Sequence, residues 1–408
     1  MVKFSTKGGR LGTPLDSARQ WGTLARRMAD TDDRRAFFAT AAKGTEGALR
    51  DELRELRLPA VKAERGGVRF GGTLLDAYRA CIGSRIAVRV LQEVGRFHCV
   101  DGDALYEGVR EAYRWDAVLD VRRTLAVTCA LKNSQLTHSA FVAQRTKDAI
   151  VDQLRETLGA RPNVDKADPD VAVFIHLVKD EATVYLDVSG ESLHRRGWRA
   201  KAREAPLKET LAAAMLRLAG WDRTRPLADP MCGSGTLAIE GAQWARRIPP
   251  GLAREVFGGE RWASHDASEA SALDDLRQEL RARIRPASDA PDVLAADLDP
   301  RAVAQTKENA RLAGVPEVHV VEQDIAALGP AEPAGHVVVN PPYGVRLASG
   351  EALIERMAYV FRTLPGHRIS VICADDLLAR ALKPLKPAQE HALWNGDLEC
   401  RLFSWDIA

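Results

Sequence analysis

From about residue 200 onward, short apolar runs alternate with longer amphipathic stretches. The apolar runs predict strands near 225–229, 292–297, 318–323, 336–340 and 368–373. The amphipathic stretches predict helices near 236–247, 300–313 and 350–364. Such alternation is typical of a parallel, doubly wound sheet. Segment 248–290 has no place in this alternation, so we expect it to be an insertion.

The end of the chain has a different pattern. Residues 390–394 and 397–403 flank Asn395-Gly396, which predicts an antiparallel hairpin. Added to the five runs above, its two strands predict an α/β domain with a mostly parallel sheet of seven strands.

The first half of the chain predicts two smaller α+β units. The first unit is expected to hold a strand at 36–42, a helix near 45–57, short strands near 60–70 and a helix near 73–83. The second is expected to hold helices at 102–112 and 138–158 and strands at 124–131, 171–178 and 182–188, with a turn at 179–181. Residues 1–35 show little periodicity and are interpreted as a disordered tail. The predicted domains are therefore 36–100, 101–190 and 191–408.

Composition narrows the class of protein. The chain of 408 residues has neither an apolar run of the roughly 18 residues needed for a membrane span nor a signal-peptide core, so a cytoplasmic protein is expected. Six cysteines without Cys-x-x-Cys spacing predict reduced thiols and no metal site. Residues 1–200 carry 33 Lys and Arg against 27 Asp and Glu, whereas residues 201–408 carry 25 against 29. The basic first half modestly favours nucleic-acid binding there.

The tetrad Asn340-Pro341-Pro342-Tyr343 directly follows a predicted buried strand. Two prolines fix the backbone and remove two donors, which leaves side-chain and backbone carbonyls as acceptors. These acceptors, with an aromatic face beside them, suit a flat ring that carries an exocyclic amine. A plain turn explains the two prolines equally well when the tetrad is taken alone.

A glycine-containing loop follows an earlier predicted strand. The segment reads Asp229-Pro-Met231-Cys232-Gly233-Ser234-Gly235-Thr236, and a predicted helix begins at its end. Glycines let a ligand approach the backbone, and the helix start offers unpaired N–H groups. A dinucleotide fingerprint fits less well, because the third glycine and the acidic residue about 20 positions later are missing.

These motifs, together with Asp297-Leu298-Asp299-Pro300, resemble the S-adenosylmethionine-dependent amino-methyltransferases of the class I fold, whose parallel sheet is closed by a hairpin. The segment 189–199, which contains His194-Arg-Arg-Gly-Trp-Arg199, narrows the resemblance to THUMP-domain RNA methyltransferases, in particular the 23S rRNA guanine-N2 methyltransferase family. The resemblance covers about 36–408 and implies that the first two domains are a ferredoxin-like domain and an RNA-binding THUMP domain. The second methyltransferase domain of some members does not follow before Ala408, so no dual activity is implied.

The resemblance also implies roles for residues at the ends of the predicted strands. Asp229 is expected to orient the methionine end of S-adenosylmethionine, Asp297 to accept hydrogen bonds from the ribose, and Asp324 to accept one from the adenine amine. Asp299 is the alternative to Asp297, although Asp before Pro is often a helix cap. The expected cofactor-binding residues are Asp229, Met231, Cys232, Gly233, Ser234, Gly235, Thr236, Asp297, Leu298, Asp324 and Ile325. The expected catalytic residues are Asn340, Pro341, Pro342 and Tyr343.

The linker is expected to contact RNA phosphates through Arg195, Arg196 and Arg199, with Trp198 among them. A solvated linker is the alternative. The resulting hypothesis is methylation of guanine N2 in 23S rRNA. Guanine N2 in tRNA, adenine N6 in a nucleic acid, and a non-catalytic RNA-binding assembly factor remain alternatives.

Overall fold

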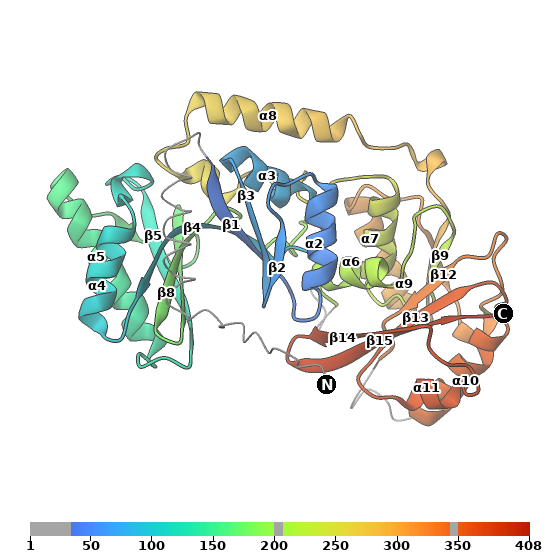
Figure 1. Cartoon of the computed structure of the whole chain (residues 1–408). Helices are drawn as coiled ribbons and strands as arrows, with labels where there is room; N and C mark the ends of the chain where they lie inside the picture. The colour runs from blue at the N-terminus through green and yellow to red at the C-terminus, as the bar shows by residue number, and fades with distance from the viewer. Residues whose placement is uncertain (1–33, 200–206, 343–349) are drawn as a thin grey trace, which may run out of the picture.

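Two sheets organise the protein (Figure 1). The computed structural model describes residues 34–199, 207–342 and 350–408. Within them the first half of the chain builds an eight-stranded sheet and the second half a seven-stranded one. The tail expected at 1–35 lies almost wholly outside the described residues.

The first sheet has the order β2-β3-β1-β4-β8-β7-β5-β6. Its strands are β1 (Arg35–Thr40), β2 (Lys62–Glu64), β3 (Gly67–Gly72), β4 (Arg89–His98), β5 (Thr124–Lys132), β6 (Asn163–Val164), β7 (Val171–Val178) and β8 (Glu181–Asp187). The predicted turn between β7 and β8 is confirmed, with Lys179 at φ 54° and Asp180 at φ 60°.

Strand β4 was not predicted, and it joins the two expected α+β units into one sheet. It pairs with β1 on one side and β8 on the other, with an irregularity between Glu93 and Gly95. Val90 lies opposite buried Ala39, whereas Phe97 lies opposite buried Ala182. The inward positions therefore change from even to odd numbers along the strand, which breaks the alternation that sequence analysis depends on.

Four helices accompany the first sheet: α2 (Glu46–Glu55), α3 (Leu74–Gly83), α4 (Gly102–Ala112) and α5 (Ser139–Leu158). Their buried faces share one apolar core with the strands, in which Leu49 and Leu53 of α2 lie with Phe37 and Phe70. The one core explains why the two expected α+β units form a continuous body.

The second sheet has the order β11-β10-β9-β12-β13-β15-β14. Its strands are β9 (Leu227–Asp229), β10 (Val293–Asp297), β11 (His319–Glu322), β12 (His336–Val339), β13 (Arg368–Cys373), β14 (Gln389–Asn395) and β15 (Leu398–Asp406). The first five in chain order are parallel, and the last two form the antiparallel hairpin. The predicted sheet is confirmed, although the turn is Gly396-Asp397, one residue later than expected.

Helices cover both faces of the second sheet. Residues of α6 (Glu209–Leu218), α7 (Thr236–Ala245) and α9 (Pro300–Leu312) build one apolar core. Residues of α10 (Gly350–Arg362) and α11 (Leu377–Ala381) build the other. Within the described ranges, we find no helix with the length and apolar character that crossing a membrane requires.

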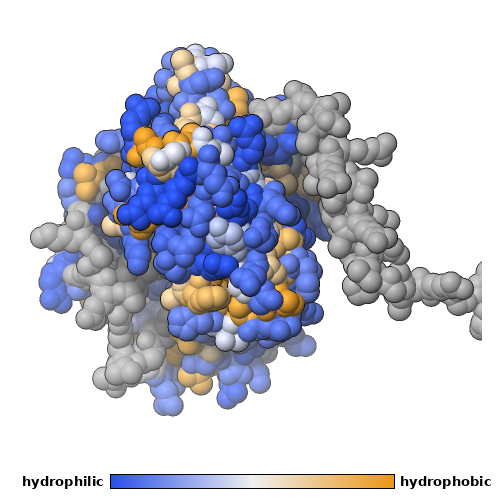
Figure 2. All heavy atoms as spheres, turned by 90° about the vertical axis from the view of Figure 1, so that its left-hand side faces the viewer, coloured by the Kyte–Doolittle hydropathy of each residue, from blue (hydrophilic) through white to orange (hydrophobic). Residues whose placement is uncertain are grey.

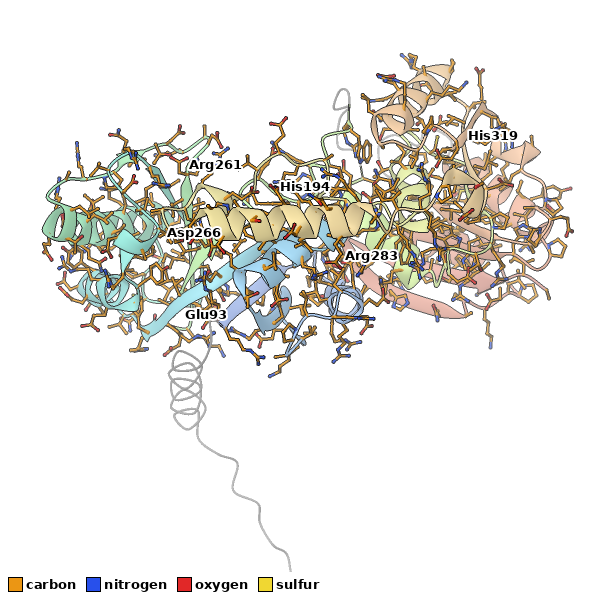
Figure 3. All side chains as sticks on the ribbon, turned by 90° about the horizontal axis from the view of Figure 1, so that it is seen from above. Glu93, His194, Arg261, Asp266, Arg283 and His319 are labelled. Atoms are coloured by element: carbon orange, nitrogen blue, oxygen red, sulfur yellow. The ribbon has the colours of Figure 1, made fainter. Side chains whose placement is uncertain are left out.

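The segment 248–290 leaves this layered pattern and returns to the first half of the chain. It holds η2 (Gly258–Arg261), α8 (Ala267–Arg281) and η3 (Ala287–Asp289). Phe257, Trp262 and Leu273 belong to the core of the first half. Seen from above, α8 runs along the molecule from its cap Asp266 towards Arg283 (Figure 3). The insertion thus fastens the two halves together.

Candidate active site

Four neighbouring parallel strands deliver the candidate site residues to one edge of the second sheet. The chain runs from β9 outward to β10 and β11, then crosses to β12 on the other side of β9. Crevices at such a reversal of strand order are where open α/β sheets bind ligands. Continuing the observed register, Asp297 at the end of β10 and Asn340 after β12 lie level with Met231. Two strand spacings, about 10 Å, separate Asp297 from Asn340.

The glycine loop is held tightly from beneath. The Thr306 Oγ1 hydroxyl of α9 donates to the Gly233 carbonyl over 2.9 Å, and the Asn309 Nδ2 amide donates to the Ser234 carbonyl over 2.9 Å. Gly235 has φ 81°, and a Cβ there would lie 2.5 Å from Thr306 Cγ2. Gly235 is therefore required by both conformation and space.

The upper side of the loop is open. Gly233 has φ 55°, and a Cβ on it would meet no heavy atom within 4 Å. Ser234 and Gly233 are half-buried, while Cys232 is buried and its thiol lies 3.7 Å from Thr306 Oγ1. Burial raises the pKa of the Cys232 thiol well above its usual range. Cys232 is thus a packing residue of the loop, and its thiol is not poised as a nucleophile.

The acids at the strand ends have distinct environments. The Asp297 carboxylate accepts from the Gly233 N–H over 2.8 Å and from the Asp299 N–H over 2.9 Å, so it fixes the loop against β10. Asp299 caps α9 by accepting from the Arg301 N–H over 2.9 Å. The neighbouring Leu298 is 67% exposed, which leaves an apolar surface beside Asp297.

The Asp229 carboxyl is buried at the end of β9. It accepts a hydrogen bond from the Met231 N–H over 3.4 Å. Burial raises its pKa to about 8, the Met231 N–H opposes that rise, and the nearby Asp297 adds to it. A cationic group brought next to this carboxyl would restore its charge.

Asp324 and Ile325 follow β11. Asp324 accepts from the Ala326 N–H over 2.8 Å, and its other oxygen pairs with Arg356 of α10 over 2.9 Å. Ile325 is buried in the core under α10. Asp324 therefore already has two partners, the Ala326 N–H and Arg356.

The corner after β12 lies beside the loop, since β12 pairs directly with β9. Asn340 is half-buried, Pro341 is buried and Pro342 is exposed. Tyr343 lies outside the described residues. No group of three or more His, Cys, Asp or Glu side chains in the described part of the chain is arranged to hold a metal ion.

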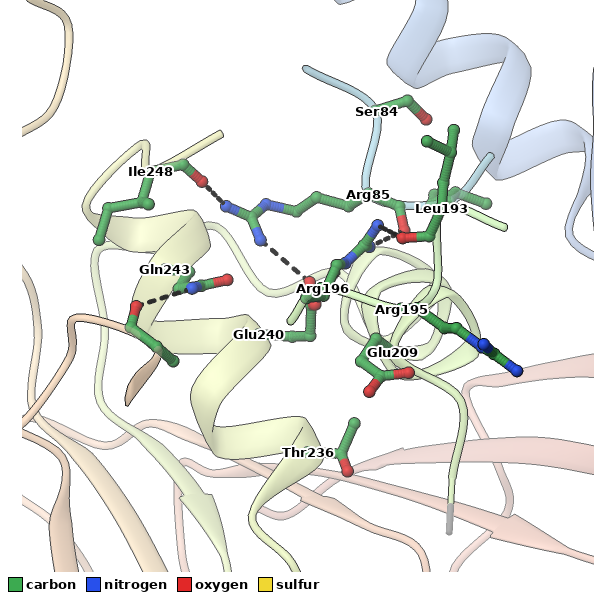
Figure 4. A network of polar contacts seen from close by, with 12 residues as sticks. Ser84, Arg85, Leu193, Arg195, Arg196, Glu209, Thr236, Glu240, Gln243 and Ile248 are labelled. Carbon is green, nitrogen blue, oxygen red and sulfur yellow. Dashed lines mark hydrogen bonds and ion pairs between the residues drawn. The ribbon is translucent and has the colours of Figure 1, made fainter. Parts of the chain in front are cut away.

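Most of the linker side chains that were expected to contact RNA are enclosed by the protein. Arg196 is buried with 2% of its side chain exposed, and its Nε lies 3.1 Å from Glu240 Oε1 of α7 (Figure 4). Trp198 is buried in the second core, and 15% of the Arg199 side chain is exposed. Side chains enclosed in this way cannot reach phosphates. The burial of Arg196 and Trp198 therefore contradicts the expectation that they contact RNA directly. Arg195, with 67% of its side chain exposed, can still make such a contact.

The residues that hold the loop from α9 were not predicted from the sequence. Thr306 and Asn309 are fully buried polar side chains on α9. They share a face with buried Val303 and Ala310. Polar residues at apolar positions of an amphipathic helix are the signal that would have identified them.

Comparisons with known proteins agree with this geometry. Residues 36–91 match the RlmL ferredoxin-like domain, 100–187 the THUMP domain, and 196–386 the RMKL-like methyltransferase domain. Two proteins described as ribosomal RNA large subunit methyltransferase K/L are similar, one from Methylococcus capsulatus (43% identity over 92% of this chain) and one from Syntrophotalea carbinolica (42% over 91%). The chain spans about half the length of these relatives, 51% and 53%.

Two solved structures resemble nearly the whole chain. The methyltransferase SMU.472, solved with SAH, has a TM-score of 0.84 at 29% identity and covers 93% of this chain and 99% of its own. A predicted N6-adenine-specific DNA methylase from Listeria monocytogenes has a TM-score of 0.82 at 30% identity and covers 92% of this chain and 97% of its own. The protein belongs to the RMKL-like methyltransferase family, with RlmL-type ferredoxin-like and THUMP domains before its class I methyltransferase domain.

Proposed function

We propose that the protein is an S-adenosylmethionine-dependent methyltransferase that acts on the N2 amine of a guanine in large-subunit ribosomal RNA. The observation that carries the proposal is the adjacency of the glycine loop after β9 and the Asn340-Pro341-Pro342 corner after β12. The ribosomal RNA methyltransferases among the relatives support the RNA class. A protein that acts on this substrate would work in the cytoplasm, where bacterial ribosomal RNA is made.

The residues present fit this cofactor. The buried Asp229 carboxyl suits an ammonium group, because a cation beside it would lower its raised pKa. The open side of Gly233 and the exposed Leu298 offer a surface for a nucleoside. Asp229, Met231 and the loop 232–236 would hold the methionine end, Asp297 and Leu298 the ribose, and Asp324 and Ile325 the adenine. When bound, S-adenosylmethionine supplies a methyl group activated by a positively charged sulfur.

The corner at the end of β12 would orient the acceptor. The amine of a guanine is a poor nucleophile because its lone pair is delocalised into the ring. The Asn340 side-chain carbonyl and the backbone carbonyl of Pro341 would accept its two hydrogens and stabilise positive charge that develops on nitrogen. A paired base must first be turned out of its helix, at a cost of a few kcal/mol. Tyr343 would stack on the extruded base.

We propose that the first half of the chain contacts the RNA. A cavity of about 300 Å³ between α5 and the segment before β7 is lined by four cationic and two acidic residues. Its lining includes Arg145, Lys147, Arg155 and Arg161. The end of the molecule that carries it is mostly hydrophilic (Figure 2). Arg195 in the linker adds an exposed cation nearer the site. Such cationic surfaces position a phosphate backbone without reading its sequence.

The test is incubation of unmodified total RNA with labelled S-adenosylmethionine, followed by nucleoside analysis of separated 23S and tRNA fractions. Label in N2-methylguanosine of the 23S fraction is expected. Asn340→Ala should remove this label while cofactor affinity stays within about twofold, because the side chain serves the acceptor. Joint loss of labelling and affinity would indicate a folding role for the corner.

Adenine N6 is the second candidate, favoured by the description of the Listeria protein and by the ability of the same corner to hold an adenine amine. Label confined to N6-methyladenine would establish it and overturn the guanine assignment.

A further inference from the structure

Arg199 ends the described part of the linker and lies between two elements of the methyltransferase domain. Its Nε donates to Glu209 Oε1 over 3.0 Å, and its Nη2 donates to the same oxygen over 2.7 Å. Its Nη1 donates to Ser234 Oγ over 3.0 Å, and Nη2 also reaches Thr236 Oγ1 over 3.2 Å. One guanidinium therefore joins α6 to the glycine loop and to the first residue of α7.

The loop needs such an external support. Gly233 and Gly235 both have positive φ, and Gly235 offers no side chain to cap α7. Thr306 and Asn309 of α9 hold the loop carbonyls, and Asp297 of β10 holds the Gly233 N–H. Arg199 adds contacts to the Ser234 and Thr236 hydroxyls. A loop whose backbone and side chains are both held loses less conformational entropy when a ligand binds.

An arginine suits this position better than other cations. Glu209 is buried, and although burial raises its pKa, Arg199 opposes that rise by favouring the carboxylate. A planar guanidinium can serve this carboxylate and two hydroxyls in fixed directions, which an ammonium cannot. The ion pair with Glu209 therefore fixes the direction of the guanidinium, so that Nη1 is held towards Ser234 and Nη2 towards Thr236.

The same linker is fastened further along α7. Arg196 and Arg85, which comes from the first half of the chain, both pair with Glu240, one turn after Thr236 (Figure 4). The labelled Arg195 points away from this network. The linker thus contacts α7 at its start and in its middle, so the position of the cofactor loop is tied to the RNA-binding half.

We propose that Arg199 is a positioning residue for cofactor binding, which acts by holding the Ser234 and Thr236 hydroxyls in the binding conformation of the loop. The inference rests on the proposed use of S-adenosylmethionine. It replaces the expectation that this arginine contacts RNA.

Titration calorimetry with SAH on the full chain tests it. Arg199→Gln should weaken SAH binding by about tenfold, the effect of one coupled polar contact. Arg195→Gln, in the same linker but exposed, should leave the affinity unchanged. In RNA methylation, Arg199→Gln should raise KM for S-adenosylmethionine by a similar factor with kcat nearly unchanged. Equal SAH affinity of wild type and Arg199→Gln would overturn the inference, whereas no SAH binding by the wild type would overturn the proposed function.

A double-mutant cycle separates positioning from direct contact. If Arg199 acts through Ser234, then Ser234→Ala should weaken SAH binding in the wild type and have little further effect in Arg199→Gln. Fully additive effects would contradict the proposal. Should Arg199→Gln fail to fold, Arg199→Lys takes its place, because it keeps a cation beside Glu209 and loses the fork. An Arg199→Lys variant with wild-type SAH affinity would equally overturn the inference.

Discussion

The buried Asp229 carboxyl is an unfavourable group for the fold, and under the proposed function it would become favourable beside the ammonium group of the cofactor. Burial raises the pKa of this carboxyl to about 8 from the usual 3.8. An acid with a raised pKa in the folded state stabilises the fold below its ordinary pKa, and this stabilisation is lost as the pH rises to about 8. Under the proposed function, the ammonium group of the cofactor would offset this loss of stability.

Asp229→Asn should therefore change the pH dependence of stability in the cofactor-free protein. Near pH 5 the carboxyl is protonated and resembles an amide, so the two melting temperatures should be similar. Near pH 9 the wild type carries a buried charge, and the variant should melt at the higher temperature. Thermal unfolding followed by circular dichroism from pH 5 to pH 9 measures the difference. A constant difference over this range would contradict the raised pKa.

The linker arginines show what sequence analysis leaves undecided at this scale. Arg195 and Arg196 are neighbours with equal charge, yet 67% of one side chain is exposed and 2% of the other. The difference comes from Glu240, which is distant in sequence and supplies the partner that makes burial of Arg196 tolerable. A sequence shows which residues are charged but not which of them find a buried partner.

At the scale of elements, the glycine loop is where the motif and the structure agree most closely. Asp229, the loop and α7 were expected as strand, turn and helix, and they form in that order. The apolar runs predicted these strands because β9, β10 and β12 are short and largely buried on both faces. The alternating pattern failed at β4, where the irregularity between Glu93 and Gly95 shifts the inward positions.

Gly235→Ala tests the tight packing of the loop on α9. A methyl group there would lie 2.5 Å from Thr306 Cγ2, and the residue has φ 81°. We expect a loss of stability of about 2 kcal/mol or more, together with weaker SAH binding. Gly314→Ala is the matched control, since Gly314 has φ 73° and open space around its missing Cβ. It should cost only about 1 kcal/mol. Urea unfolding of both variants makes the comparison, and equal losses would show that φ alone is responsible.

At the scale of the whole molecule, the two halves share buried contacts of two kinds. The insertion 248–290 contributes Trp262 and Leu273 to the core of the first half. The Gly251 N–H also donates to the Ile82 carbonyl over 2.9 Å. The motifs identified both halves, but the sequence of the insertion does not predict which part of the chain it packs against. Long-range packing of this kind depends on the surfaces of two folded units.

The buried ion network is the second connection, and it yields a prediction about how the halves unfold. Glu240 is fully buried between Arg85 and Arg196, so Glu240→Gln would leave two buried cations without a counter-charge. Breaking such a network costs about 3–5 kcal/mol. Glu55→Gln removes another pair between the halves, Glu55 with Arg217, but 58% of the Glu55 side chain is exposed and about 0–1 kcal/mol is expected. Hydrogen exchange followed by mass spectrometry should show faster exchange in both α3 and α7 for Glu240→Gln and little change for Glu55→Gln. Faster exchange in α7 alone would mean that the network stabilises the methyltransferase domain without coupling it to the first half of the chain.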